Sequence, residues 1–98
     1  MEKRVVVTGI GVVSPVGNNV DAMWESIKAG RHGIAEITRF DLEGHKVTLA
    51  AEVKDFDFGD KRAAKRLDIA DQYALVAARE AVADSGIVSG ENVDPDRF

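Results

Sequence analysis

The chain has 98 residues, of which 45% are hydrophobic and 31% charged, a balance typical of a globular domain rather than of a disordered tail or a membrane protein. Seventeen acidic against 13 basic residues give a net charge of −4, which argues against nucleic-acid binding over the whole surface, because such binding needs a basic excess. The 98 residues include no cysteine, which excludes disulfides, cysteine-ligated metals and a cysteine nucleophile within them.

No apolar run reaches the roughly 18 residues that a membrane-spanning helix needs. The charged residues 2–4 precede an apolar run over residues 5–13, as in a signal peptide. However, two glycines interrupt that run, Ser14-Pro15 ends it, and no small-residue cleavage site follows. We therefore expect a cytoplasmic protein without a membrane partner.

The first predicted element is a strand over residues 5–13. This run is rich in β-branched residues and has no polar alternation, which indicates a strand covered on both faces, as in the middle of an α/β sheet. Gly9 and Gly11 leave the same face of the strand bare. This spacing predicts that another backbone or side chain approaches closely there.

A helix is predicted next, capped by Asn18, with Asp21 as a weak capping box and with Gly30 just past its end. Its apolar residues recur at i, i+3, i+4 and i+7 and form one stripe: Val20, Met23, Trp24 and Ile27. The stripe predicts one buried helix face.

Residues 30–60 are predicted to be mostly ordered loop, with a short strand within residues 47–53. Residues 55–58 alternate between aspartate and phenylalanine, which indicates an edge or loop segment with two anchored rings. A loop of this length is typical of a functional region or of a part of a larger assembly.

The clearest predicted helix covers residues 68–85, with Asp68 as its cap and Gly86 at its end. Leu75 and Val76 widen its apolar arc, so we expect it to be buried on more than one side. Residues 87–98 are polar and rich in turn formers, as in an approach to another element. The helical repeat itself is mostly alanine, which allows a neighbour to come close: Ala70, Tyr73, Ala74, Ala77, Ala78, Ala81 and Val82.

The Gly-x-Gly pair within residues 8–14 has a second interpretation, a dinucleotide-binding loop. That fingerprint needs a third glycine or alanine where this chain has Ser14, and the following helix begins only after Pro15. Packing glycines are therefore favoured, and a small dinucleotide-binding module stays as a minor alternative. His32 and His45 have no ligand partner at metal-binding spacing, so we expect loop roles and no metal site.

The strongest local signal is a basic cluster between residues 61 and 66. On a helix its four side chains fall within one arc of about 140°. Like charges four residues apart repel, so the cluster has no evident local structural benefit. It is either an ordinary solvated face or a docking surface for phosphate or an acidic protein, with nucleic acid a minor option because no aromatic residues are interleaved. Its members are Lys61, Arg62, Lys65 and Arg66.

Taken together, these segments resemble the N-terminal part of a β-ketoacyl-acyl-carrier-protein synthase, the condensing enzyme of type II fatty-acid synthesis. The resemblance covers essentially the whole chain, and it departs from the family's usual pattern at His32, where serine is more frequent. It implies an α/β, thiolase-like fold with α-β-α-β-α layers, in which residues 1–98 supply the first core strand and its following helices as an incomplete first half. The motifs that carry it are residues 4–18, Trp24, residues 29–34, Phe40-Asp41, residues 53–56, Gln72-Tyr73 and residues 84–86.

The reaction that the resemblance implies is a decarboxylative Claisen condensation. In the family a cysteine takes the acyl group, and two histidines aided by a lysine assist decarboxylation and hold the oxyanion. None of these residues can be placed in this chain, since it has no cysteine and His32 and His45 do not correspond to the catalytic histidines. We therefore expect no catalytic residue, cofactor or metal here, and no activity of the chain alone.

The resemblance also implies partners, namely an acyl carrier protein loaded with acyl or malonyl groups and a second copy in a homodimer. The basic cluster resembles the surface on which the acidic carrier docks, so Lys61, Arg62, Lys65 and Arg66 are the predicted carrier contacts. The alternative is a non-catalytic ketosynthase-like partner of the chain-length-factor type.

Overall fold

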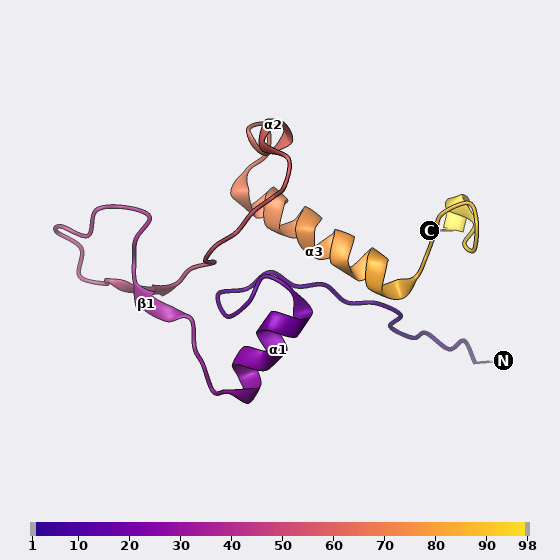
Figure 1. Ribbon diagram of the computed structural model, residues 1–98, viewed down its shortest axis with the longest axis horizontal. Coiled ribbons are helices and arrows are strands. Elements are labelled where there is room, and N and C mark those ends of the chain that lie inside the picture. Colours follow the sequence, from indigo (N-terminus) through magenta and orange to yellow (C-terminus); the bar gives the residue numbers. More distant parts are fainter. Residues whose placement is uncertain (1, 98) are drawn as a thin grey trace.

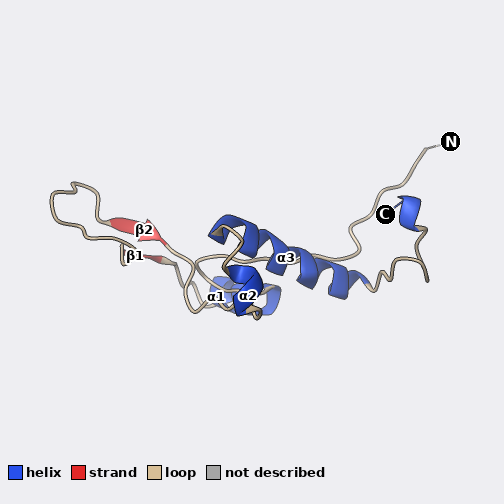
Figure 2. Cartoon of the chain, turned by 90° about the horizontal axis from the view of Figure 1, so that it is seen from above, coloured by secondary structure: helices blue, strands red, loops and turns tan. Residues whose placement is uncertain are grey.

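The computed structural model describes residues 2–97 as an elongated chain of 58 × 35 × 24 Å (Figure 1). The N-terminal segment runs beside the longest helix, and a small hairpin projects from the opposite end (Figures 1 and 2). The elements in chain order are α1 (Val20–Lys28), β1 (Ile34–Glu36), β2 (Leu49–Ala51), α2 (Lys61–Ala64), α3 (Ile69–Ser85) and the 3-10 helix η1 (Pro95–Arg97).

The predicted strand over residues 5–13 is not formed. Within residues 2–97 this segment pairs with no strand, and Val5 and Val7 are 94% and 81% exposed. Residues 2–97 therefore do not supply the expected cover on both faces. A strand exists only through ladder hydrogen bonds to a neighbouring backbone. The neighbour here is α3, whose own backbone groups are used within the helix, so it contacts the segment through carboxylate side chains instead.

The predicted close approach at Gly9 and Gly11 is confirmed. A Cβ atom at Gly11 would lie 2.8 Å from the Ala81 nitrogen and closer still to the carbonyl oxygen of Ala77. A Cβ atom at Gly9 would lie 2.6 Å from the Ser85 nitrogen. The two glycines and the small side chains of α3 therefore let the two backbones touch, which supports packing over dinucleotide binding.

Helix α1 ends where predicted, just before Gly30, but its N-cap lies one residue later than predicted. Asn19, not Asn18, is the N-cap, and its Oδ1 accepts a hydrogen bond of 2.8 Å from the Ala22 nitrogen. Asn18 instead donates from Nδ2 to the carbonyl of Lys54 at 2.7 Å. Gly30 follows the last turn with φ +73°, as expected for a left-handed helix terminus.

The apolar stripe of α1 faces residues 10–12. Together they line a mainly apolar groove of about 340 Å³. The stripe is only partly covered, because Trp24 is still 56% exposed and Ile27 49%.

Helix α3 follows the predicted range closely. Asp68 is its N-cap residue without a side-chain capping bond, and Gly86 ends it with φ +72°. Residues 2–97 do not bury α3 on more than one side, since the face away from residues 9–12 leaves Leu75 and Val82 40% and 43% exposed. An open groove of about 490 Å³ runs along this outer face.

The hairpin pairs β1 with β2 antiparallel, with Ile34 opposite Ala51. Strand β2 lies within the predicted range 47–53, whereas β1 lies in a stretch predicted to be loop. The two predicted anchored rings are confirmed: Phe56 packs edge-on against Tyr73 with ring centroids 4.7 Å apart, and Phe58 is 7% exposed beneath the Arg79 guanidinium.

A buried carboxylate holds the base of this hairpin. Glu52 is 9% exposed and accepts hydrogen bonds from the backbone nitrogen and the hydroxyl of Thr38 at 3.1 and 3.0 Å. Lys54 Nζ lies 3.5 Å from the same carboxylate. Burial raises the pKa of Glu52, but the Thr38 bonds and the Lys54 charge lower it more, so the net pKa lies below the ordinary 4.5.

We expect the hairpin to loosen in acid. A lowered folded-state pKa means that Glu52 contributes its stability above pH 4.5 and loses it as the pH falls through the lowered value. In an NMR titration the Thr38 amide shift should therefore move below pH 4.5. Glu52→Gln should abolish this movement, while Glu36→Gln, at an exposed site on β1, should keep it. A Thr38 amide that titrates equally in Glu52→Gln would contradict the assignment.

Candidate functional site

The basic cluster lies on α2 and the turn after it. Asp60 caps α2, because its Oδ1 accepts from the nitrogens of Arg62 and Ala63 at 3.0 and 3.1 Å. The helix ends at Ala64 and so does not extend through all of residues 61–66. The Arg66 nitrogen nevertheless donates to the Ala63 carbonyl at 3.0 Å. The backbone therefore keeps turning, and the four basic residues stay close together.

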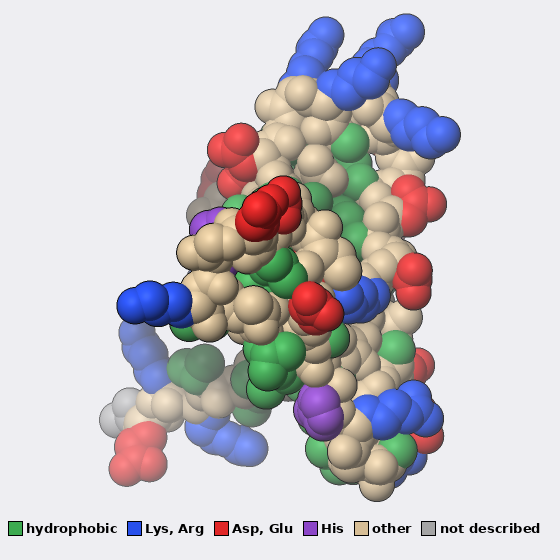
Figure 3. All heavy atoms as spheres, turned by 90° about the vertical axis from the view of Figure 1, so that its left-hand side faces the viewer, with side chains coloured by type: hydrophobic (Ala, Val, Ile, Leu, Met, Phe, Trp, Pro, Cys, Tyr) green, Lys and Arg blue, Asp and Glu red, His purple; other side chains and the backbone are tan. Residues whose placement is uncertain are grey.

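All four basic side chains are exposed. Figure 3 shows a group of basic side chains at the top of the molecule, over α2, while other basic side chains and the acidic ones lie lower down. The ion pairs found within residues 2–97 join Glu25 to Lys28 and Glu52 to Arg39 and Lys54, and none involves the cluster. The cluster's positive charge is therefore directed to solvent, as a docking surface requires.

The cluster is anchored to α3 by one glutamine. Gln72 donates from Nε2 to the carbonyls of Ala64 and Leu67 at 3.0 and 3.1 Å. These two bonds fix the turn that carries Lys65 and Arg66 relative to the long helix. The basic surface is thus held on a defined element and not on a loose loop.

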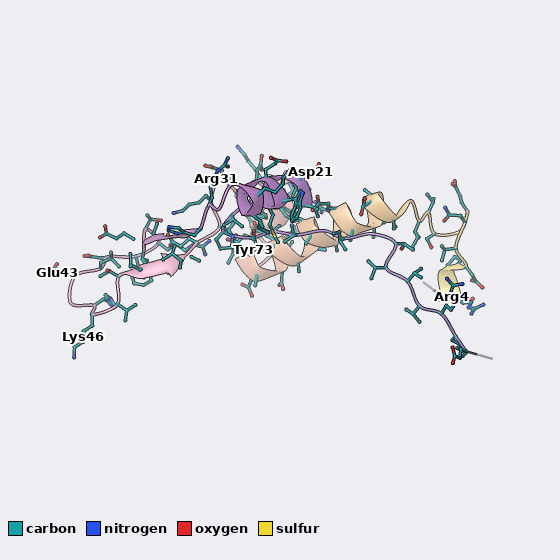
Figure 4. The ribbon with its side chains drawn as sticks, turned by 90° about the horizontal axis from the view of Figure 1, so that it is seen from below. Arg4, Asp21, Arg31, Glu43, Lys46 and Tyr73 are labelled. Carbon is teal, nitrogen blue, oxygen red and sulfur yellow. The ribbon has the colours of Figure 1, made fainter. Side chains whose placement is uncertain are left out.

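Below the cluster, Tyr73 joins α3 to the hairpin region. Its hydroxyl accepts a hydrogen bond of 2.5 Å from Arg39 Nη2. Figure 4 shows Tyr73 among the helices, with Glu43 and Lys46 at the far tip of the hairpin loop. Arg31 and Asp21 point outward from the region of α1 in the same view.

The two histidines occupy the predicted loop positions. His32 Nδ1 accepts from the Ile34 nitrogen at 3.3 Å, and the His45 ring lies 5.3 Å from that of Phe40. Among residues 2–97 no three acidic or histidine side chains are grouped as a metal site would require. In the same part of the chain, no helix combines the length and apolarity needed to cross a membrane.

A pair of acidic residues on α3 was not identified from the sequence. Glu80 accepts from the Val12 nitrogen with Oε1 and from the Val20 nitrogen with Oε2, both at 2.9 Å. Asp84 accepts from the Ile10 nitrogen at 3.1 Å. The signal available in the sequence was that Glu80 and Asp84 are four residues apart, on the side of α3 that carries Ala77 and Ala81. These carboxylates fix the N-terminal segment and the start of α1 on α3.

Comparison with known proteins gives consistent matches. A family model described as "Beta-ketoacyl synthase, N-terminal domain" matches residues 2–97. The 3-oxoacyl-[acyl-carrier-protein] synthase 2 of Staphylococcus aureus (strain COL) is 50% identical over 93 residues, which cover 92% of this chain and 22% of the relative. The protein of the same description from Coxiella burnetii (strain RSA 493 / Nine Mile phase I) is 46% identical over 99 residues, which cover 97% and 24%.

A solved structure, the ishigamide ketosynthase/chain length factor, superimposes with a TM-score of 0.67 at 40% identity. The match covers 85% of this chain and 21% of that chain. It confirms the predicted α/β, thiolase-like fold class. The chain spans about a fifth to a quarter of the length of the curated relatives that it matches. Because the family model covers almost every residue, the chain belongs to the β-ketoacyl synthase family, in whose N-terminal domain it lies.

Proposed function

We propose that this chain is the N-terminal part of a 3-oxoacyl-[acyl-carrier-protein] synthase II. The observation that carries the proposal is the identity of 50% over nearly the whole chain to a relative of that description. Residues 1–98 would form the incomplete beginning of the first thiolase-like half. The enzyme would work in the cytoplasm as a homodimer, and the valines at residues 5–7 would be covered by sheet neighbours from other parts of the enzyme.

The proposed reaction elongates a fatty acyl chain by two carbons. A cysteine thiolate outside this chain attacks the acyl-carrier thioester, and the carrier thiol leaves. Malonyl-carrier protein then loses CO₂, and its carbanion attacks the acyl-enzyme thioester. The new carbon–carbon bond forms as the cysteine thiolate is released. This chain supplies no reacting group, so alone it should be inactive.

Within this proposal, residues 61–66 dock the carrier protein. The support is physical: four exposed positive charges without an acidic partner in residues 2–97 lie together on an otherwise acidic chain. Exposed opposite charges accelerate encounter more than they tighten binding, and salt screens them. Carrier docking at Lys61, Arg62, Lys65 and Arg66 should therefore be fast and sensitive to salt.

Charge reversal tests the docking role. In the complete synthase, Lys65→Glu combined with Arg66→Glu should raise the KM for the carrier substrate about tenfold at low salt, with kcat nearly unchanged. The effect should shrink above about 0.1 M salt, where the Debye length falls below about 10 Å. The matched control is Arg31→Glu with Lys46→Glu, which makes the same charge change on other exposed elements (Figure 4). A KM unchanged at low salt would reject the role.

A second candidate function is a non-catalytic partner subunit. It is favoured by one observation, that the solved neighbour's description includes a chain length factor. Incubating the complete protein with acyl-carrier protein distinguishes the two. A mass increase by one acyl group on a cysteine supports the enzyme, whereas an unmodified protein that still binds the carrier supports the partner subunit.

A further inference from the structure

The hairpin and α2 are separate elements that are attached to neighbouring residues of α3. In Figure 1 the hairpin projects to one side, while α2 lies above the start of α3. Gln72 binds the turn after α2 through two hydrogen bonds, and the next residue, Tyr73, binds the hairpin region. The first turns of α3 are therefore a common support for both elements.

Arg39 connects the hairpin to Tyr73. Its Nη2 donates to the Tyr73 hydroxyl at 2.5 Å, while its Nε lies 3.8 Å from Oε2 of Glu52. Because a guanidinium is planar and rigid, a contact on its Nε side fixes the direction in which its Nη side points. Glu52 is buried, and the backbone nitrogen and hydroxyl of Thr38 donate to it. A fixed carboxylate at the base of the hairpin therefore directs Arg39 toward Tyr73.

Tyr73 also contacts the segment that leads into α2. Its ring packs edge-on against Phe56, with the centroids 4.7 Å apart, and Phe56 lies four positions before Asp60, the N-cap residue of α2. At the other end of α2, Gln72 donates to two carbonyls of the helix and the turn that follows. Consecutive residues of α3 thus hold both ends of α2, and of these two Tyr73 also binds Arg39.

We propose that Glu52, Arg39 and Tyr73 form a positioning relay that couples the order of the hairpin to the order of α2. Residues in one network of hydrogen bonds and ion pairs are coupled in free energy, so a change at one alters the stability of the others. Glu52 is a positioning residue here, because it acts on α2 through Arg39. A ligand or subunit that moves the hairpin would then change how firmly the basic residues 61–66 are held. The coupling requires no bound carrier, so its test is independent of the proposed function.

Hydrogen exchange followed by mass spectrometry on the complete protein measures the coupling. Glu52→Gln removes the charge that directs Arg39, and it should speed the exchange of backbone amides in residues 60–67 about threefold. Tyr73→Phe removes the hydroxyl but keeps the ring against Phe56, and it should have a similar effect.

The matched control is Glu36→Gln, which makes the same chemical change at an exposed site of β1. It should leave the exchange of residues 60–67 unaltered. If Glu36→Gln speeds this exchange as much as Glu52→Gln does, or if neither variant speeds it, the relay is overturned.

The variant that combines Glu52→Gln with Tyr73→Phe identifies the route. If the effect passes through the Tyr73 hydroxyl, residues 60–67 should exchange no faster in the double variant than in Tyr73→Phe alone. Effects that multiply would mean that the disturbance travels along the backbone from the hairpin to α2, and this result would also overturn the proposal.

Arg39→Lys provides a second test should either of these variants disturb the whole fold. A lysine keeps the charge but has no planar fork that contacts Glu52 and Tyr73 together. Exchange of residues 60–67 should again rise about threefold, while residues 20–28 of α1 serve as the unaltered internal reference. Unchanged exchange of residues 60–67 in Arg39→Lys would show that the guanidinium does not connect the two elements, contrary to the proposal.

Discussion

Gly11→Ala is expected to lower the free energy of unfolding by about 3 kcal/mol, at the upper end of the usual cost of overpacking. The added methyl would meet the carbonyl of Ala77 and the nitrogen of Ala81, which are backbone atoms of α3 and cannot rotate away. The only relief is to move the N-terminal segment off the helix. Urea unfolding followed by Trp24 fluorescence measures the effect, because Trp24 lies on the same groove as Gly11.

Gly44→Ala is the control for this substitution. Gly44 has φ +82°, and a Cβ atom there meets nothing within 4 Å. Its replacement should cost only the strain of a left-handed backbone, about 1 kcal/mol. If Gly11→Ala is no more destabilising than Gly44→Ala, then residues 9–11 do not contact α3 as the structure shows.

The close approach at Gly9 and Gly11 could be predicted because it depends on short-range signals. Two glycines on one face and a helix rich in alanine indicate contact between backbones wherever the two elements meet. The ends of α1 and α3 were predictable for a similar reason, since Gly30 and Gly86 adopt left-handed φ values that few other residues tolerate. The start of α1 was ambiguous between two adjacent asparagines, and a bond from Asn18 to the Lys54 carbonyl settles it.

The differences between the expected elements and the structure concern pairing over long distances in sequence. The β-branched run over residues 5–13 has the propensity of a strand, but propensity provides no partner, and none lies within residues 2–97. Strand β1 was missed because three residues carry little periodicity and their partner lies 15 or so positions later. These features depend on the arrangement of the whole chain.

The candidate site was predictable only in part. The spacing of the basic residues indicated one exposed surface, and the structure places the four side chains together on and after α2. The groove of about 320 Å³ beside this surface was not predictable, because it depends on where α2 ends; it is lined by Asp60, Arg62, Ala63, Arg66 and Leu67. The role of Glu80 was also hidden, since its two hydrogen-bond donors lie 68 and 60 residues away in the sequence.

Glu80→Ala is expected to lower the free energy of unfolding by about 2 kcal/mol, within the range for lost hydrogen bonds to a charged group. The nitrogens of Val12 and Val20 would both lose their acceptor. Glu80→Gln keeps one acceptor oxygen and should lose about half as much. Glu43→Ala, at the exposed hairpin tip (Figure 4), should stay within about 0.5 kcal/mol of the unaltered protein. Urea unfolding followed by Trp24 fluorescence again provides the measurement.

Combining the two substitutions tests whether Glu80 and Gly11 hold the same interface. Gly11→Ala already moves the N-terminal segment off α3. In the Gly11→Ala background the Val12 nitrogen therefore no longer donates to Glu80, and replacing Glu80 removes no further bond at that nitrogen. The double variant should therefore lose less stability than the sum of the single variants, with a coupling of about 1 kcal/mol. Strict additivity would mean that the carboxylate and the glycine act at independent contacts. Because Glu80 also binds the first turn of α1, some of its effect should persist in the Gly11→Ala background.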